Sequence, residues 1–245
     1  KKFTVLKMSA EEWKPDRNAM KILCGMGIPM GLQYSITAIG SVVIQTAVNT
    51  LGSVAVASVT AGGKVSLFFC CPFDAMGCTM ATYGGQNAGA AQWDRLHQGI
   101  RACVILGAVY SAVSLAVLAV FSNPLNMLFL DAGSVSLLPL ARKYLLTNVL
   151  FYFPLSLVNI IRFMIQGMGF APLATVAGIF EMAARAGLAF LVPLYGFTAA
   201  CFASPAAWIL ADVFLVPAYF HCCRRLTQAG AGKREKAAAL SAPGV

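Results

Sequence analysis

The sequence predicts an all-α membrane protein, a bundle of six transmembrane helices, and three observations support this fold class. Of its 245 residues, 59% are apolar or aromatic and only 11% are charged. When Gly replaces Tyr in the count the apolar share is about 65%, against about 45–50% in soluble domains, where about 25% of residues are charged. The mean hydropathy is +0.75, and the apolar residues form six long segments. A cytosolic enzyme, a disordered regulator and a secreted disulfide scaffold are excluded.

The first three segments are separated by turn-forming residues. A span needs about 20 mostly apolar residues to cross about 30 Å of hydrocarbon. The first segment, Ile22–Asn49, ends before a Thr-Leu-Gly turn. The second runs from Ser53 to about Tyr83, is long enough to be tilted, and ends at residues 84–87, Gly-Gly-Gln-Asn. The third, Ile100–Phe121, is closed by an Asn-Pro pair. We expect α-helices, because backbone exposed to lipid must satisfy its own hydrogen bonds.

The last three segments follow a connection, Leu125–Pro139, that we expect to lie at the outer membrane interface. They are Leu140–Ile165, Pro172–Tyr195 and Thr198–Cys222. Cations lie on one side of this arrangement. Six precede the first span and five follow the last, and with Arg162 counted after the fourth span we assign fourteen to the side of the termini and none to the outer connections. The positive-inside rule therefore places both termini in the cytoplasm.

Neither the excess of basic over acidic residues nor the eight cysteines indicates nucleic-acid or metal binding. Cations that flank spans contact anionic lipid headgroups, so we expect lipid and no nucleic acid as a partner. The cysteines lie in apolar segments, no Cys-x-x-Cys occurs and there are only two histidines, so we expect buried thiols and no metal site. Residues 84–90, GGQNAGA, lack the Lys-Ser/Thr of a phosphate loop. We expect no cofactor and no enzymatic activity.

Charged residues inside the spans are the strongest functional signal, because such groups are costly in lipid and usually functional or paired. Measured along each helix, Lys64, Glu181, Arg185 and Asp212 fall near the midplane, and Asp74 falls deeper toward the cytoplasm. Glu181 and Arg185 are one turn apart, a spacing that favours an ion pair. The pair either fixes the fifth span to its neighbours or contains a carboxylate whose protonation or cation binding is coupled to conformation.

The remaining polar groups leave two alternatives open. Lys64 and Asp212 need partners on other helices or a water-filled cavity, and with Asp74 we interpret them as cavity or gating charges. The net charge of these five intramembrane residues is negative, which suits cationic substrates. A polar row on the first span either packs against other helices or lines a cavity; its members are Gln33, Thr37, Ser41, Gln45 and Asn49, of which we assign Gln33, Thr37 and Gln45 to a lining.

Four motifs occur in a distinctive order: GIPMGLQYS at 27–35, TYGGQNAGA at 82–90, IIRFMIQGMG at 160–169 and GIFEMAARAG at 178–187. In this order and spacing, the chain resembles the C-terminal half of a MATE-type multidrug and toxic compound extrusion transporter over residues 22–222. The family's sodium-coupled branch carries an acid shortly after the first-span proline, and residues 29–37 contain none. That difference argues against the branch's sodium site here, and a coupling acid in the other lobe remains an alternative.

The resemblance implies two six-helix lobes around a V-shaped cavity, in a cell (inner) membrane. This chain would be the second lobe, with 1–21 as a cytoplasmic inter-lobe linker, 22–223 as the lobe and 224–245 as a basic cytoplasmic tail. The N-terminal lobe would be its partner. The implied activity is export of organic cations or drugs by alternating access, in exchange for H⁺ or Na⁺. Two alternatives are a flippase for lipid or lipid-linked oligosaccharide and a non-transporting assembly or sensor subunit.

Overall fold

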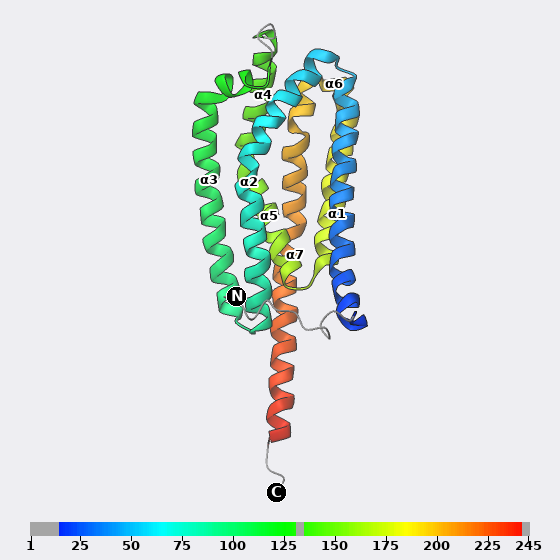
Figure 1. The fold of residues 1–245 in the computed structure, drawn as a ribbon, viewed down its shortest axis with the longest axis vertical. Helices are drawn as coiled ribbons and strands as arrows, with labels where there is room; N and C mark the ends of the chain where they lie inside the picture. Colours follow the sequence, from blue (N-terminus) through cyan, green and yellow to red (C-terminus); the bar gives the residue numbers. More distant parts are fainter. Residues whose placement is uncertain (1–14, 131–134, 242–245) are drawn as a thin grey trace, which may run out of the picture.

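The predicted spans are helices in a computed structural model, which describes residues 15–130 and 135–241 (Figure 1). Five helices are long and apolar enough to cross a membrane, and a bent pair of shorter helices meets the same criteria when the two are counted as one span. Counted in this way, the described residues contain the six predicted spans. In chain order the helices are α1 (Arg17–Asn49), α2 (Ser53–Gly89), α3 (Trp93–Met127), the short 3-10 helix η2 (Val135–Leu137), α4 (Leu138–Leu150), α5 (Tyr152–Gly167), α6 (Ala171–Tyr195) and α7 (Phe197–Ser241).

Short turns connect these helices and need particular residues. The side chain of Asp16 accepts a hydrogen bond of 2.8 Å from the backbone N–H of Asn18 and caps the start of α1. Gly52, between α1 and α2, has φ +92°, and Gly196, between α6 and α7, has φ +62°. Only glycine adopts such angles without steric cost. These turns make successive helices antiparallel.

The predicted turn at residues 84–87 is wrong, because α2 continues as a helix to Gly89. Glycine is needed here for close packing against α5. A Cβ on Gly84 would lie 2.7 Å from the sulfur of Met164, and one on Gly85 would lie 3.1 Å from the carbonyl oxygen of Gly167. In membranes small residues allow helices to approach each other closely, so this glycine-rich stretch forms a helix contact rather than a loop.

The fourth span is bent by 50° between α4 and α5. The break lies at Phe151, and Pro154 follows in the first turn of α5. Proline has no N–H to donate to the preceding turn, which accounts for the interruption. After the bend, α5 lies in the middle of the bundle, where it contacts α2, α3, α6 and α7. It is consequently buried over most of its length.

Several helices extend further than expected. α1 begins at Arg17, α3 passes Pro124 to end at Met127, and α7 continues beyond Cys222 and leaves the bundle as a projecting helix (Figure 1). Residues 1–14 of the predicted linker, residues 131–134 of the predicted interfacial connection and the last four residues of the predicted tail lie outside the described residues.

Candidate functional site

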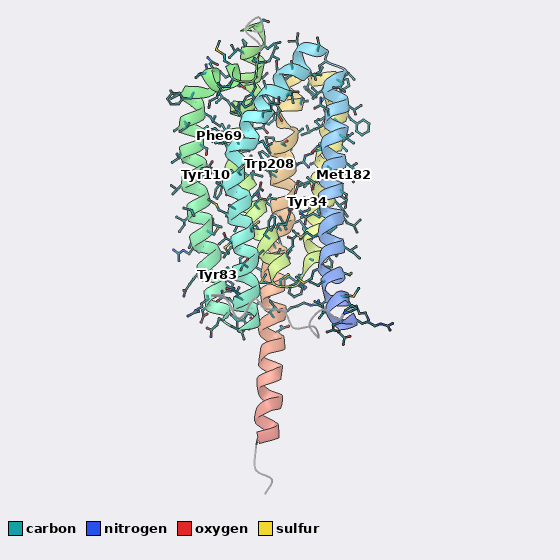
Figure 2. All side chains as sticks on the ribbon, in the orientation of Figure 1. Tyr34, Phe69, Tyr83, Tyr110, Met182 and Trp208 are labelled. Carbon is teal, nitrogen blue, oxygen red and sulfur yellow. The ribbon has the colours of Figure 1, made fainter. Side chains whose placement is uncertain are left out.

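The interior of the bundle contains a carboxylate between two guanidinium groups. Glu181 on α6 is 2% exposed, and Arg162 on α5 and Arg185 on α6 are each 6% exposed. An Nη2 hydrogen of Arg162 is donated to Oε1 of Glu181, and Nη2 of Arg185 lies 3.3 Å from Oε2. Met182, the neighbour of Glu181, lies about halfway along the bundle (Figure 2). The predicted pair of Glu181 and Arg185 is therefore present, and it is part of a triad.

Arg162 is the member of this triad whose position the sequence predicts incorrectly. Its place after the fourth span predicts a position at the cytoplasmic membrane surface, but α5 carries it into the packed centre of the lobe. The available signal was its spacing from Asn159 and Gln166, which puts three polar side chains on one face of an apolar helix. Without Arg162, the membrane side that carries the termini still has far more cations than the opposite side.

Asp212 on α7 lies close enough to Arg162 to interact with it electrostatically. Its side chain is half-buried, and its Oδ1 atom is buried without a hydrogen-bond partner among the described residues. The same is true of Nε of Arg162. Two acids on α6 and α7 thus share the environment of two arginines on α5 and α6. The net charge of this charged cluster, defined as Arg162, Glu181, Arg185 and Asp212, is zero.

A hydrogen bond one helical turn beyond Arg162 connects α5 to α1. Nε2 of Gln166 donates a hydrogen bond of 2.6 Å to Oε1 of Gln33, which is buried. Gly178 on α6 makes room for this contact, because a Cβ there would lie 3.4 Å from Cγ of Gln33. Thr37, one turn further along α1, has a buried hydroxyl without a hydrogen-bond partner among the described residues. Gln33 therefore packs against other helices, which is one of the two alternatives for the polar row.

Gln45 of the same row lines a small cavity inside the bundle. The cavity has a volume of about 160 Å³ and is also lined by Ser41 of the same helix, Tyr144 of α4, Arg185 of α6 and Ser204 of α7. Nε2 of Gln45 also donates a hydrogen bond of 3.1 Å to Oδ1 of Asn49. A volume of this size admits several water molecules, each of which occupies about 30 Å³ in the liquid. The cavity joins the charged cluster, through Arg185, to the polar residues of α1.

The structure does not bring Lys64 or Asp74 to the charged cluster. Lys64 is exposed on α2, and its Nζ atom lies 5.7 Å from the ring centroid of Phe129, just past the end of α3. Asp74 is exposed on α2 and lies within electrostatic range of the Tyr34 hydroxyl on α1. Tyr34 is itself 54% exposed and lies near the middle of the bundle (Figure 2). These two aligned helices therefore present an acid and an aromatic ring on an uncovered surface.

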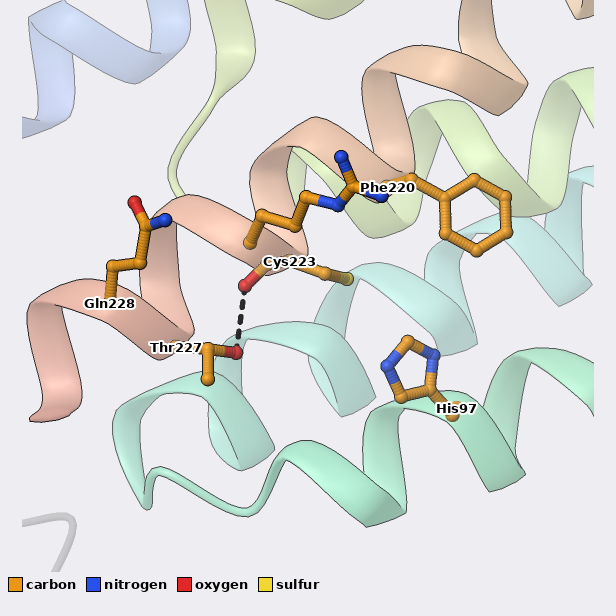
Figure 3. A pocket seen from close by; sticks show the side chains of 6 residues that line it. His97, Phe220, Cys223, Thr227 and Gln228 are labelled. Atoms are coloured by element: carbon orange, nitrogen blue, oxygen red, sulfur yellow. Dashed lines mark hydrogen bonds between the residues drawn. The ribbon is translucent and has the colours of Figure 1, made fainter.

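A second polar region lies at the end where α7 leaves the bundle. A hollow of about 500 Å³ between α3 and α7 is lined by His97, Phe220, Cys223, Arg224, Thr227 and Gln228 (Figure 3). Nδ1 of His97 lies 3.1 Å from the Tyr219 hydroxyl. Across residues 15–130 and 135–241, no group of three or more His, Cys, Asp or Glu side chains is placed to hold a metal ion.

Solved structures share the fold of this chain. A MATE protein crystallised in complex with MaL6 superposes with a TM-score of 0.84 over 92% of the chain and 51% of that protein, at 16% identity. An outward-facing multidrug resistance MATE transporter of the MOP superfamily gives a TM-score of 0.83 with the same coverages and identity. A MOP superfamily transporter from Pyrococcus furiosus, described by the reverse polarity of its binding pocket, gives 0.69 over 80% of the chain and 43% of that protein at 18% identity.

Sequence comparison agrees with the fold. The probable multidrug resistance protein YoeA of Bacillus subtilis (strain 168) is 25% identical over 169 residues, which cover 69% of the chain and 36% of YoeA. The chain thus spans about a third of that relative's length and about half of the first two solved structures. The MatE family model matches residues 29–191, which include the charged residues of α5 and α6. On this match, the chain belongs to the MatE family of multi-pass membrane proteins.

Proposed function

We propose that this chain is the C-terminal lobe of a cation-coupled antiporter that exports organic cations or drugs by alternating access. The family match and the multidrug resistance names of its relatives support the export of drugs. The matched transporters are about twice as long as the chain, which supports a second, N-terminal six-helix lobe as the partner. The one-sided distribution of surface cations supports cytoplasmic termini in a cell membrane.

The observation that best supports coupling is the position of Asp212 beside Arg162. Glu181 is held by two guanidinium groups, which stabilise its ionised form. Asp212 has a buried oxygen without a hydrogen-bond partner among the described residues, and Arg162 is a cation within electrostatic range of it. We assign Asp212 as the carboxylate that takes up H⁺ or Na⁺, and Glu181 as the group that holds both arginines.

This assignment explains how ion binding would act on the lobe. When Asp212 is ionised, it attracts Arg162 of α5 toward α7; when an ion neutralises it, Glu181 of α6 is the remaining partner of Arg162. A ligand shifts a conformational equilibrium only through different affinities for the two states. Exchange of Arg162 between two acids supplies such a difference, because α5 contacts both α6 and α7.

The substrate surface that we propose is the exposed side of α1 and α2. Asp74 would attract a cationic substrate, and the ring of Tyr34 would stack on that cation. A cation–π interaction of this kind contributes about 0.5–2 kcal/mol. Lys64 would lie at the edge of this surface, beside Phe129. With Arg162 included, the six intramembrane charges sum to zero rather than to an acidic excess. The preference for cations is therefore assigned to the local Asp74 surface.

The test is dye export by the complete transporter in proteoliposomes with imposed proton or sodium gradients. We expect wild-type export of a cationic dye to be stimulated by one gradient, and Asp212→Asn to abolish that stimulation. Glu181→Gln should reduce transport by either gradient. Asp94→Asn, which alters an exposed acid in the first turn of α3, is the matched control and should transport normally.

Two results would contradict the proposal. Gradient-stimulated export that survives in both Asp212→Asn and Glu181→Gln would remove the coupling role of this lobe. Absence of dye export together with gradient-independent movement of a fluorescent phospholipid between leaflets would instead identify a flippase.

A further inference from the structure

One face of α7 forms a continuous apolar stripe that ends in a cation. Ile209, Val213, Val216 and Phe220 follow one another at spacings of three or four residues, and all are exposed. This spacing places them on the same side of a helix. Arg224 continues the series at the end where α7 leaves the bundle. We call these five residues the α7 stripe.

Two hollows with different linings lie at the two ends of the stripe. An apolar groove of about 440 Å³ lies between α6 and α7, where Gly187 and Leu188 face Ile209 and Val213. The polar hollow of about 500 Å³ lies between α3 and α7 and includes Phe220 and Arg224 (Figure 3). The stripe connects the two along a single helix.

The polar hollow offers hydrogen-bond donors and positive charge to an anion. The exposed guanidinium of Arg224 and the amide of Gln228 line it, and no acidic side chain among the described residues does. When Nδ1 of His97 accepts the hydroxyl hydrogen of Tyr219, Nε2 carries the ring proton and can donate as well. Phe220 at its edge provides an apolar transition to the stripe. A phosphodiester with an attached hydrocarbon chain has this combination of properties.

The dimensions match one leaflet of a bilayer. Val213 is eleven residues from Arg224, which corresponds to about 16 Å along a helix. Half of the hydrocarbon core is about 15 Å thick. An acyl chain whose headgroup lies at Arg224 therefore ends in the groove beside Ile209 and Val213.

We propose that the α7 stripe binds one anionic glycerophospholipid, with its phosphate in the polar hollow and an acyl chain in the apolar groove. Exposed arginines at the same end, Arg95 and Arg101 on α3 and Arg225 on α7, add to the positive potential. Such potentials attract anionic lipids by about 1 kcal/mol for each cation near the surface. The proposal does not depend on export or on its coupling ion.

The experiment measures thermal unfolding of the purified complete transporter in detergent with added lipid. Palmitoyl-oleoyl phosphatidylglycerol should raise the Tm in a saturable manner, and the matching phosphatidylcholine should raise it less. Arg224→Gln should weaken the apparent phosphatidylglycerol affinity about five-fold, the loss of one cation–phosphate contact. Arg225→Gln removes the same charge from a residue that contributes to the general potential but does not line the hollow, and should weaken the affinity clearly less than Arg224→Gln does.

A second variant tests the hydrocarbon part of the site. A Cβ at Gly187 meets nothing within 4 Å, so Gly187→Leu fills the groove without disturbing the fold, and should weaken binding of the long-chain lipid but not of dihexanoyl phosphatidylglycerol. Equal stabilisation by the two headgroups, or equal losses in Arg224→Gln and Arg225→Gln, would overturn the proposal. Saturation by glycerol phosphate at the same affinity would show a free phosphate site and would overturn the lipid assignment.

Discussion

Arg162 on α5 forms an ion pair with Glu181 on α6, across a separation of 19 positions in the chain. The contact joins α5, which is buried over most of its length, to α6. Because Arg185 holds the other oxygen of the same carboxylate, the arrangement depends on the packing of α5 and α6 as well as on helical spacing within α6.

Arg162→Gln should lower the free energy of unfolding by about 2–3 kcal/mol, because the substitution removes a charged hydrogen bond from a buried carboxylate that keeps only one partner. Thermal or denaturant unfolding in detergent measures this loss. The control is Arg95→Gln on the exposed surface of α3, which should change stability by less than about 0.5 kcal/mol. Equal losses in the two variants would show that the ion pair contributes no specific stability.

Gly167→Ala should destabilise the lobe by about 1–3 kcal/mol or prevent its folding, because overpacking forces backbone shifts. The added Cβ would lie 2.0 Å from the carbonyl oxygen of Ala81 on α2. At Gly25 on α1 a Cβ meets nothing within 4 Å, so Gly25→Ala should be neutral or stabilising by up to about 1 kcal/mol. Circular dichroism of both variants during heating distinguishes them, and a stable Gly167→Ala protein would contradict the tight contact of α2 with α5.

Ala200→Leu and Ala207→Leu form a matched pair on α7. Both alanines are buried, but only Ala200 lines the cavity of about 160 Å³ beside Arg185. The larger side chain at Ala200 has space to enter, whereas at Ala207 it overpacks the core at a cost of about 1–3 kcal/mol. We therefore expect a distinctly lower Tm only for Ala207→Leu. A reversed order would mean that the cavity is occupied or closed.

Asp74→Asn should raise the KM for a monovalent cationic dye about five-fold in the complete transporter, because one Coulomb interaction of about 1 kcal/mol in an aqueous environment is lost. The KM for an uncharged substrate should not change, which separates recognition of charge from damage to the fold. Transport kinetics with both substrates measure the difference. Equal changes for the two substrates would remove Asp74 from the proposed substrate surface.

Part of the charged cluster could be predicted from local spacing. Glu181 and Arg185 are one turn apart on the same helix, so the chain itself brings them together. Arg162 and Asp212 could not be placed in this way, because their distance depends on the rotation of α5 and α7 about their axes. The bend at Phe151 sets that rotation for α5, and a proline near the middle of an apolar segment indicates a bend but not its direction.

The glycines of residues 84–90 could also be interpreted only in part from the sequence. Glycine is common both in turns and where helices touch, and the run Gly-Gly-Gln-Asn predicts a turn. In the structure the glycines form a helix contact, because Met164 and Gly167 of α5 occupy the space that side chains at Gly84 and Gly85 would need. Local propensity alone does not include that neighbour.

Composition and hydropathy alone indicate that the protein lies in a membrane, how many spans it has and how the spans alternate in direction. These properties follow from the transfer of apolar side chains into lipid and from the cost of moving cations across it, both of which sum over the chain without regard to folding. Helix packing establishes which charges meet, that Gln33 packs while Gln45 lines a cavity, and that Lys64 and Asp74 stay apart from the cluster. Such contacts depend on how helices are rotated and bent against one another, and no single helix carries that information.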